Sequence, residues 1–228
     1  MIVVVTAAFG GGLDLLAPDF VAPDVQYVAY TDDPKLESRW WQVKLVPPDP
    51  SVTPRFQAKR YKVLTHELFP YAEHSLWVDS TFSLAVDPRY LVEASLQKTD
   101  LALFSHPWRD CIYEEADACI ADGLDLSERI RGQMERYRAA AYPARNGLAA
   151  CGILLRRHTP AIAALNRAWW TEIVRHSVRD QLSFDYVCWR LGVRYRKLAG
   201  GYYDNPYFRY RRQEVVPEVE RLRLRASA

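Results

Sequence analysis

The stretch His74-Ser-Leu-Trp-Val-Asp-Ser-Thr-Phe82 decides how the fold is interpreted. Its apolar residues 76–78 predict a buried strand, and this strand stops at one carboxylate, Asp79. A strand that ends in an acidic residue places a charge at the carboxyl edge of a sheet, where open α/β sheets bind their ligands. An aspartate in an ordinary turn would give the same pattern. Asp79 is therefore a candidate site residue. Whether it belongs to a site or to an ordinary turn depends on the residues found elsewhere in the chain.

Length and composition indicate an ordinary globular chain. The 228 residues are enough to bury a substantial core in one large domain or two small ones. The net charge of +2 does not by itself indicate nucleic acid or an acidic membrane as a partner. The four cysteines form no CxxC pair and fit no zinc template, so we expect a reduced, cytoplasmic protein. No apolar run approaches the roughly 20 residues needed to cross a bilayer, and the apolar N-terminus predicts a buried strand rather than a signal peptide.

Strand and helix patterns alternate along the chain. Strands are expected at residues 2–6, 25–30, 40–46, 76–78, 101–105, 152–155 and 193–198. Helices are expected at residues 55–69, 88–96, 114–121 and 127–141, from 159 onward, and over 177–191, with Ser127 and Ser177 as N-caps and Gly192 after the last helix. This alternation predicts a single α/β domain over residues 1–208, in which helices cover both faces of a mixed, mostly parallel sheet. A basic tail, residues 209–228, follows.

Polar or small residues follow the first two predicted strands. The segment Thr6-Ala-Ala-Phe-Gly-Gly-Gly12 is neither GxGxxG nor a Walker loop, which argues against a dinucleotide fold and a P-loop ATPase. Its small residues would still let a ligand approach the backbone. Asp32 and Asp33, after the second strand, could accept hydrogen bonds from a ribose or a base edge. A plain glycine loop and an Asp-rich turn explain the same residues equally well.

The predicted helix over residues 55–69 carries a basic stripe. Its members are Arg55, Lys59, Lys62 and His66, at spacings that place all four on one face. A solvated surface is the usual explanation of such a stripe. Because like charges one turn apart mildly destabilise a helix, a polyanionic partner such as a diphosphate would also account for it.

Titratable residues gather in two further places. His106, Arg109, Glu114 and Glu115 crowd into a loop and the start of a helix, which is typical of a site, although glutamates also complement a helix dipole. Asp180 follows Ser177 by three residues in the first turn of a predicted helix. Capping chemistry explains Asp180 without a function, whereas a carboxylate held beside a cleft could be a catalytic base or a sugar ligand.

Taken together and in order, the motifs resemble a known family. They are Thr-Ala-x-Phe-Gly, Tyr-Thr-Asp, Ala-Lys-Arg, Trp-Val-Asp-Ser-Thr-Phe, His-Pro-x-Arg-x-Cys-Ile-Tyr-Glu-Glu-Ala, Gly-Ile-Leu, Arg-Asp-Gln-x-Ser-Phe and Asn-Pro-Tyr-Phe. This series resembles the DUF616 (TOD1/MUCI70-like) glycosyltransferase domain, which has a GT-A-type, Rossmann-related fold. The resemblance covers the chain from Ile2 to about Phe208.

The resemblance implies transfer of a sugar from a nucleotide-diphosphate donor, with a UDP-sugar expected, to a hydroxyl acceptor such as a saccharide or surface glycan. Carried over by position, the residues that would hold the nucleoside are Thr6, Ala7, Ala8, Phe9 and Asp32. Those that would lie near the diphosphate are Arg55, Lys59 and Arg60. Asp79 would hold Mn²⁺ or Mg²⁺ on the diphosphate, because it stands where GT-A enzymes carry Asp-x-Asp.

The remaining implied roles concern the sugars. Asp180, with Gln181 beside it, would face the donor sugar or the acceptor, as a base or as an orienting residue. The residues that would recognise the acceptor or a sugar are His106, Arg109, Glu114 and Glu115.

The sequence departs from the family pattern at the metal motif. Asp-Ser-Thr offers one carboxylate, whereas hard divalent ions prefer several oxygen ligands, and no histidine follows His176. Two other hypotheses stay open. The Arg-rich tail and aromatics could engage nucleic acid, which would make the chain a base- or DNA-modifying sugar transferase. The missing carboxylate also fits a non-catalytic module that binds a nucleotide sugar.

Overall fold

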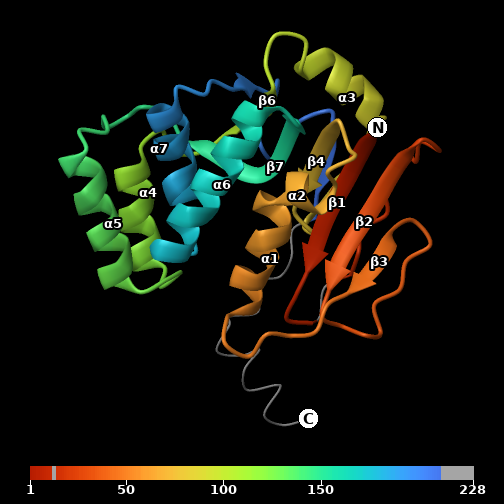
Figure 1. The fold of residues 1–228 in the computed structure, drawn as a ribbon, viewed down its shortest axis with the longest axis horizontal. Coiled ribbons are helices and arrows are strands. Elements are labelled where there is room, and N and C mark those ends of the chain that lie inside the picture. The colour runs from red at the N-terminus through yellow and green to blue at the C-terminus, as the bar shows by residue number, and fades with distance from the viewer. Residues whose placement is uncertain (12–13, 212–228) are drawn as a thin grey trace.

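Seven strands pair into one mixed sheet in the spatial order β3-β2-β1-β4-β7-β6-β8 (Figure 1). The computed structural model describes residues 1–11 and 14–211, and every structural statement below refers to these. The strands of the sheet are β1 (Ile2–Ala8), β2 (Val25–Thr31), β3 (Gln42–Leu45), β4 (His74–Val78), β6 (Leu101–Ser105), β7 (Ala149–Arg157) and β8 (Arg196–Lys197). A second sheet pairs β5 (Phe82–Leu84) with β9 (Phe208–Tyr210).

Strand direction changes only at β7 within the main sheet. β1 lies parallel to β2 and β4, and β3 continues this parallel half beside β2. β7 runs antiparallel to both β4 and β6. The β-branched run at the start of β1 is buried from Val3 to Val5, as expected of a strand that is covered on both faces. The predicted mixed, mostly parallel sheet is confirmed.

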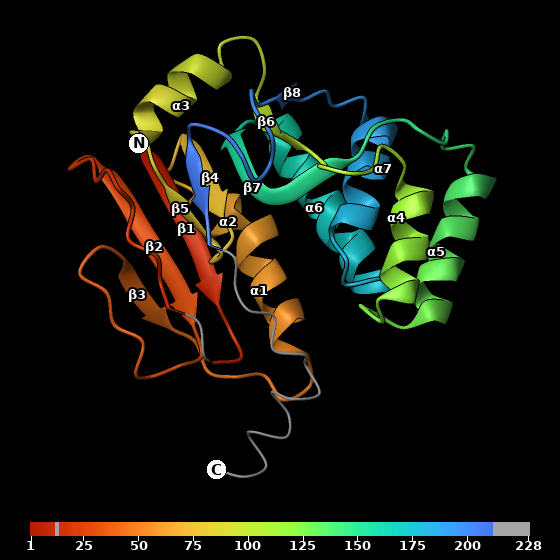
Figure 2. The ribbon, with the colours of Figure 1, turned by 180° about the vertical axis from the view of Figure 1, so that it is seen from behind.

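Helices cover both faces of the sheet, but unequally. The described helices are α1 (Pro54–Val63), α2 (Thr65–Leu68), α3 (Pro88–Ser95), α4 (Ile112–Ala121), α5 (Ser127–Ala139), α6 (Pro160–Arg175) and α7 (Gln181–Leu191). One core layer joins Val5 and Trp77 of the sheet to helix residues such as Trp169. The other layer joins the opposite face of the sheet to α3 and the small sheet, through Leu91 and Phe208. Figure 2 shows α3 apart from the group formed by α4, α5, α6 and α7.

The predicted helix over residues 55–69 is two helices. α1 ends at Val63, and α2 begins after Leu64. The buried Arg156 donates to the carbonyl oxygens of Lys62 (2.8 Å) and Val63 (3.3 Å), so the last carbonyls of α1 are satisfied from outside the helix. His66 consequently leaves the basic face. It lies buried on α2, where its Nδ1 is 3.1 Å from Asn166 Nδ2.

Neither predicted serine N-cap is an N-cap. α5 begins at Ser127 itself, and its cap position is Leu126. α7 begins at Gln181 with Asp180 at the cap position, because Ser177 forms its own turn: its hydroxyl accepts from the Arg179 N–H and donates to Asp125. Gly192 ends α7 with a positive φ of 65°, as predicted.

Several strands differ in length from the prediction. β3 and β8 are shorter than expected and β7 is longer, because pairing with neighbours rather than apolar content decides where a strand ends. The strands β5 and β9 were not predicted, and β9 continues past residue 208 to Tyr210. The rest of the predicted tail, residues 212–228, lies outside the described residues. Among the described helices, none has the length and apolarity of a membrane span.

Candidate active site

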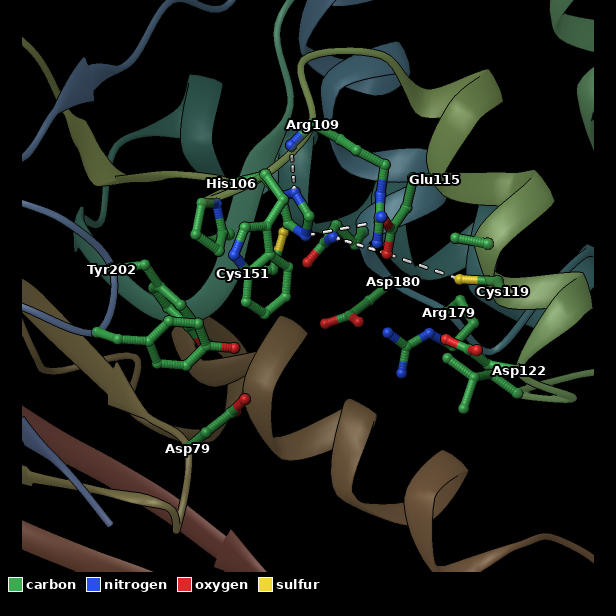
Figure 3. A pocket seen from close by; sticks show the side chains of 18 of the residues that line it. Asp79, His106, Arg109, Glu115, Cys119, Asp122, Cys151, Arg179, Asp180 and Tyr202 are labelled. Carbon is green, nitrogen blue, oxygen red and sulfur yellow. Dashed lines mark hydrogen bonds and ion pairs between the residues drawn. The ribbon is translucent and has the colours of Figure 1, made fainter. Parts of the chain in front are cut away.

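A cavity opens where β4 ends and β7 passes beside it (Figure 3). Its walls come from α1, the loop after β6, α4, the start of α7 and the turn before β9. Its charged and aromatic lining residues are Lys59, Lys62, Asp79, His106, Trp108, Arg109, Glu115, Asp122, Arg179, Asp180, Tyr202 and Tyr203. Four of these side chains are cationic (Lys59, Lys62, Arg109, Arg179) and four are anionic (Asp79, Glu115, Asp122, Asp180). The charges in the cavity wall therefore balance.

Asp79 directly follows β4 and points into the cavity (Figure 3). Its backbone N–H donates to the carbonyl oxygen of Gly152 at 2.8 Å, which extends the pairing of β4 with β7. The indole N–H of Trp77 donates to Asp79 Oδ1 at 2.6 Å. The strand end predicted from the sequence thus presents the Asp79 carboxylate, which is fixed by a hydrogen bond from Trp77 on the same strand.

Two lysines of α1 form ion pairs with a second carboxylate of the cavity, Asp180. Lys59 Nζ lies 2.8 Å from Asp180 Oδ1, and Lys62 Nζ lies 2.6 Å from Asp180 Oδ2. Lys62 Nζ also lies 3.6 Å from Asp79 Oδ1, so one ammonium group bridges both aspartates. Burial lowers the pKa of Lys59 to about 8, although Asp180 opposes this effect. Burial acts in the same direction on Lys62, but the two carboxylates outweigh it and its pKa is raised.

The ion pairs restrict what Asp180 can do. Burial would raise the pKa of this carboxyl, but the two lysines outweigh burial and hold the pKa well below its usual range. A carboxylate in this state is a weak proton acceptor at neutral pH. Its backbone carbonyl also accepts from the indole N–H of Trp169 at 2.9 Å, so its position is fixed. The geometry therefore suits an orienting role better than that of a base.

The opposite wall is built around the buried Glu115. Its carboxylate accepts from Arg109 Nε at 2.6 Å and from Gln181 Nε2 at 3.0 Å. His106 Nε2 lies 3.7 Å away, and His106 Nδ1 accepts from the backbone N–H of Arg109 at 3.0 Å. Burial lowers the pKa of His106, which favours its neutral form. Glu114 does not join this group. Adjacent residues of a helix point about 100° apart, and Glu114 pairs with Arg145 on the surface.

Two cavity residues escaped the sequence analysis because they depend on each other. A Cβ on Gly152 would lie 1.9 Å from the Tyr202 hydroxyl and 2.9 Å from Asp79 Oδ2. Only glycine at this position of β7 lets the Tyr202 hydroxyl reach the cavity beside Asp79. The sequence signal was a glycine at the start of a predicted strand. In the structure it lies inside β7, where glycine often marks close approach of another group.

Arg179 is a further cavity residue that sequence reasoning missed, although it stands in the Arg-Asp-Gln motif. It lines the cavity wall, and its Nε is buried without a hydrogen-bond partner among the described residues. None of its nitrogens lies within 4 Å of a carboxylate oxygen in the part of the chain that the structure describes. Arg179 is therefore a cation that faces the cavity with its charge uncompensated by a direct ion pair.

The residues predicted to hold the nucleoside lie outside the cavity wall, at the carboxyl ends of β1 and β2. Both oxygens of Asp32 accept from the N–H of Gly10, at 2.9 and 3.1 Å, which ties the glycine loop to β2. Phe9 stacks on Tyr61 of α1 with ring centroids 5.5 Å apart. The other members of this predicted set, Thr6, Ala7 and Ala8, are buried within β1.

The predicted diphosphate residues of α1 separate in the structure. Lys59 faces the cavity, whereas Arg60 is exposed outside it. Arg55 is exposed too, and its Nη1 donates to the carbonyl of Leu124 at 3.4 Å, at the rim of the cavity.

The described residues do not form a metal site by themselves. Within residues 1–11 and 14–211, no group of three or more His, Cys, Asp or Glu side chains is arranged to hold a metal ion. Asp79 supplies one carboxylate, and the ammonium of Lys62 already stands 3.6 Å from it. Because Mn²⁺ and Mg²⁺ need several oxygen ligands, a bound ligand would have to complete the shell.

Two arginines from the start of the basic tail are paired with acids. Arg209 Nε lies 2.6 Å from Asp19, and Arg211 Nη1 lies 3.7 Å from Asp14. The other arginines of the predicted tail, Arg212, Arg221, Arg223 and Arg225, lie outside the described residues.

Comparison with known proteins places this geometry in context. Residues 24–208 match the family described as TOD1/MUCI70, glycosyltransferase-like domain. Two relatives come from Arabidopsis thaliana. The chain is 31% identical to "Probable hexosyltransferase MUCI70" over 157 residues, which cover 64% of the chain and 27% of that protein. It is 30% identical to "Alkaline ceramidase TOD1" over 143 residues, which cover 55% of the chain and 30% of that protein.

The chain thus spans less than a third of the length of these two relatives. Among solved structures, a glycosyltransferase involved in the glycosylation of the major capsid of PBCV-1 is 13% identical, with a TM-score of 0.47 and 96% of each chain covered.

Proposed function

The chain belongs to the TOD1/MUCI70 glycosyltransferase-like domain family, and from this premise we propose that it transfers a sugar from a nucleotide-diphosphate donor to a hydroxyl acceptor. A UDP-sugar is the expected donor and a saccharide the expected acceptor. The relatives' own activities belong to much longer proteins, so the proposal rests on the family and on the cavity.

The observation that carries the proposal is the bridge made by Lys62. Its ammonium reaches a carboxylate at the end of β4 and another at the start of α7, at 3.6 and 2.6 Å. Fixed, partly buried charges of both signs are what a sugar with several hydroxyls and a leaving diphosphate require. Such charges act strongly because little solvent reorganises around them during the reaction.

We assign roles by position in the cavity. Arg179 and Lys59 neutralise charge that develops on the departing nucleotide diphosphate, since both are cations that face the cavity. Asp180 orients the donor sugar, because its two oxygens are already paired with lysines. The group of Glu115, Arg109 and His106 forms the opposite wall and contacts the acceptor or the sugar.

A divalent ion would bind at this site together with the nucleotide-sugar donor. When bound, it would offset charge on the diphosphate as a Lewis acid. Asp79 is the residue that would share it, and diphosphate oxygens and water would supply the other ligands.

Hydrolysis of a ceramide, which the name of one relative suggests, is not the function that this cavity favours. A lipid amide requires an apolar channel for its acyl chains, whereas the wall here carries four cations and four anions.

The test is a panel of nucleotide sugars incubated with the protein, with and without Mn²⁺, in which release of free nucleoside diphosphate is measured. Asp79→Asn should lower the rate of release by roughly 10²–10³-fold, as expected when a charge that stabilises the transition state is removed. Asp117→Asn is the matched control, because Asp117 is exposed on α4 and lies outside the cavity.

Circular dichroism and the unfolding midpoint would establish that both variants are folded. Full activity of Asp79→Asn would contradict the assignment of the site. Absence of nucleotide release from every donor, with tight UDP binding, would instead favour a non-catalytic binding module.

A further inference from the structure

Two exposed aromatic rings, Trp108 and Tyr203, line the cavity, and a third, Tyr210, packs against Tyr203. Trp108 is 69% exposed, Tyr203 38% and Tyr210 39%. The ring centroids of Trp108 and Tyr203 lie 5.6 Å apart, and those of Tyr203 and Tyr210 lie 4.6 Å apart, so the three rings form one continuous surface. We call this surface the aromatic platform. Large exposed aromatic surface is costly in water, and a contiguous patch of it commonly marks a binding site.

The platform is held rigidly from beneath. The loop that carries Trp108 is tied to the strand layer by the N–H of His106, which donates to the Leu148 carbonyl at 2.7 Å. The turn that carries Tyr203 is organised by Asn205, whose side-chain oxygen accepts from the N–H groups of Tyr207 and Phe208 at 3.0 and 2.8 Å.

The same turn begins at a glycine. Gly200 has φ = +87°, and a Cβ there would lie 3.0 Å from Asn205. Phe82 of β5 packs against Tyr210 with ring centroids 5.1 Å apart, so the small sheet supports the far end of the platform. Preorganised rings lose little entropy when a ligand binds.

The platform is continuous with the cavity. Trp108 and Tyr203 both belong to the cavity wall, and Tyr203 contacts Tyr202, whose hydroxyl points toward Asp79 (Figure 3). A molecule that lies on these rings therefore extends directly to the place where the two aspartates meet Lys62. Such a molecule would enter from solvent, as an acceptor must.

The charges beside the platform favour a neutral ligand. Arg209, which neighbours Tyr210, is paired with Asp19 at 2.6 Å, and Arg211 is paired with Asp14 at 3.7 Å. Among the described residues, the two arginines beside Tyr210 are thus already paired with acids, whereas a nucleic acid would require unpaired cations along these rings for its phosphates. A sugar ring needs none, because its C–H face packs on an aromatic ring while its hydroxyls stay hydrated.

We propose that the aromatic platform of Trp108, Tyr203 and Tyr210 is the acceptor subsite, and that it binds a neutral sugar ring of a saccharide. This inference rests on the proposed transfer function and specifies its acceptor class. The acceptor's sugar ring lies on Trp108 and Tyr203, and its reacting hydroxyl is directed into the cavity.

The test measures binding of soluble di- and trisaccharides of glucose, galactose, mannose and xylose, by saturation-transfer NMR and calorimetry, with and without UDP. Trp108→Ala and Tyr203→Ala should each weaken binding of the saccharide that the wild type selects by about 3- to 10-fold, the range expected for loss of one aromatic contact. The Kd for UDP should change by less than about twofold, since the residues proposed to hold the nucleoside lie at the carboxyl ends of β1 and β2 rather than in the platform.

Trp40→Ala and Tyr71→Ala are the matched controls, because both rings are exposed and lie outside the cavity wall. Unchanged saccharide binding in Trp108→Ala and Tyr203→Ala, or no saccharide bound by the wild type, would overturn the proposal. Preferential, salt-sensitive binding of single-stranded DNA or RNA on the same rings would overturn it too. Failure of UDP binding alone would count against the proposed function, not against the platform.

Discussion

Two buried carboxylates of the α7 region, five positions apart, are in opposite electrostatic situations. Asp180 is ion-paired with Lys59 and Lys62, which hold its pKa well below the usual range. Asp185 forms no ion pair with either lysine, and burial raises its pKa to about 6. Hydrogen bonds from the Tyr195 hydroxyl (2.6 Å) and the Ala149 N–H (2.8 Å) lower the pKa of Asp185, but by less than burial raises it.

The Asp185 carboxyl should make stability fall as pH rises. Between about pH 4 and pH 6 the unfolded chain is ionised at this position while the folded chain keeps the proton, so the folded state binds more protons and loses stability toward high pH. From pH 4.5 to pH 7, we expect the wild type to lose roughly 2 kcal/mol relative to Asp185→Asn. Urea unfolding of both proteins at the two pH values measures this difference. A constant difference would contradict the prediction.

At the scale of the element, α1 is the helix that decides the site. It presents Lys59 and Lys62 to the cavity, and the buried Arg156 of β7 determines where it ends. Arg156 is 1% exposed, and among the described residues it has no carboxylate within 4 Å. Its guanidinium instead binds the carbonyl of Lys62 and the hydroxyl of Thr65, as a cation does at a helix C-terminus.

Arg156→Met should therefore destabilise the protein by about 3 kcal/mol or more, because it leaves buried carbonyls without donors. Arg156→Lys should recover only part of the loss, since an ammonium cannot reproduce the planar fork. Urea unfolding gives the magnitudes, and Arg131→Met, an exposed position on α5, is the control. A loss no larger than that of the control would show that Arg156 does not hold the end of α1.

At the scale of the whole molecule, the cavity is a place where distant segments converge. Asp79 and Asp180 are far apart in the chain. Asp79 follows β4 and Asp180 precedes α7, and because α7 packs on β7 beside β4, the two carboxylates meet with Lys62 between them. The four cations and four anions of the wall cancel, so the wall has no net positive charge. The negative charge of a bound diphosphate would therefore not be fully neutralised by the wall.

From this balance we expect Mn²⁺ and UDP to bind together. Mn²⁺ alone should bind weakly, because the described residues offer no group of three ligands, and UDP should raise its affinity by at least about tenfold. Electron paramagnetic resonance of free Mn²⁺, with and without UDP, measures this coupling, and Asp79→Asn should abolish it. By linkage, Mn²⁺ must raise the affinity for UDP by the same factor. Equal Mn²⁺ affinity with and without UDP would refute the expectation.

Local pattern predicted the regular elements well, for physical reasons that act over a few residues. Apolar runs predicted the central strands, and the glycine after α7 was correctly placed because it needs a positive φ. The helix over 55–69 was predicted as one element, because its break depends on Arg156, which is about 90 residues away in the chain. Ser177 was misassigned as a cap for the same reason, since its hydroxyl donates to the distant Asp125.

By itself, the sequence determined the class of fold and the acidic end of β4, because these follow from periodicity and from which residues end a strand. The resemblance to the family, rather than any local pattern, implied that residues 106–115 and Asp180 belong to one site. Only the tertiary structure decided that Glu115 rather than Glu114 faces the cavity, that Gly152 admits Tyr202, and that Lys62 bridges Asp79 and Asp180. Contacts between segments that are far apart in the chain depend on packing of the whole sheet, which no local pattern encodes.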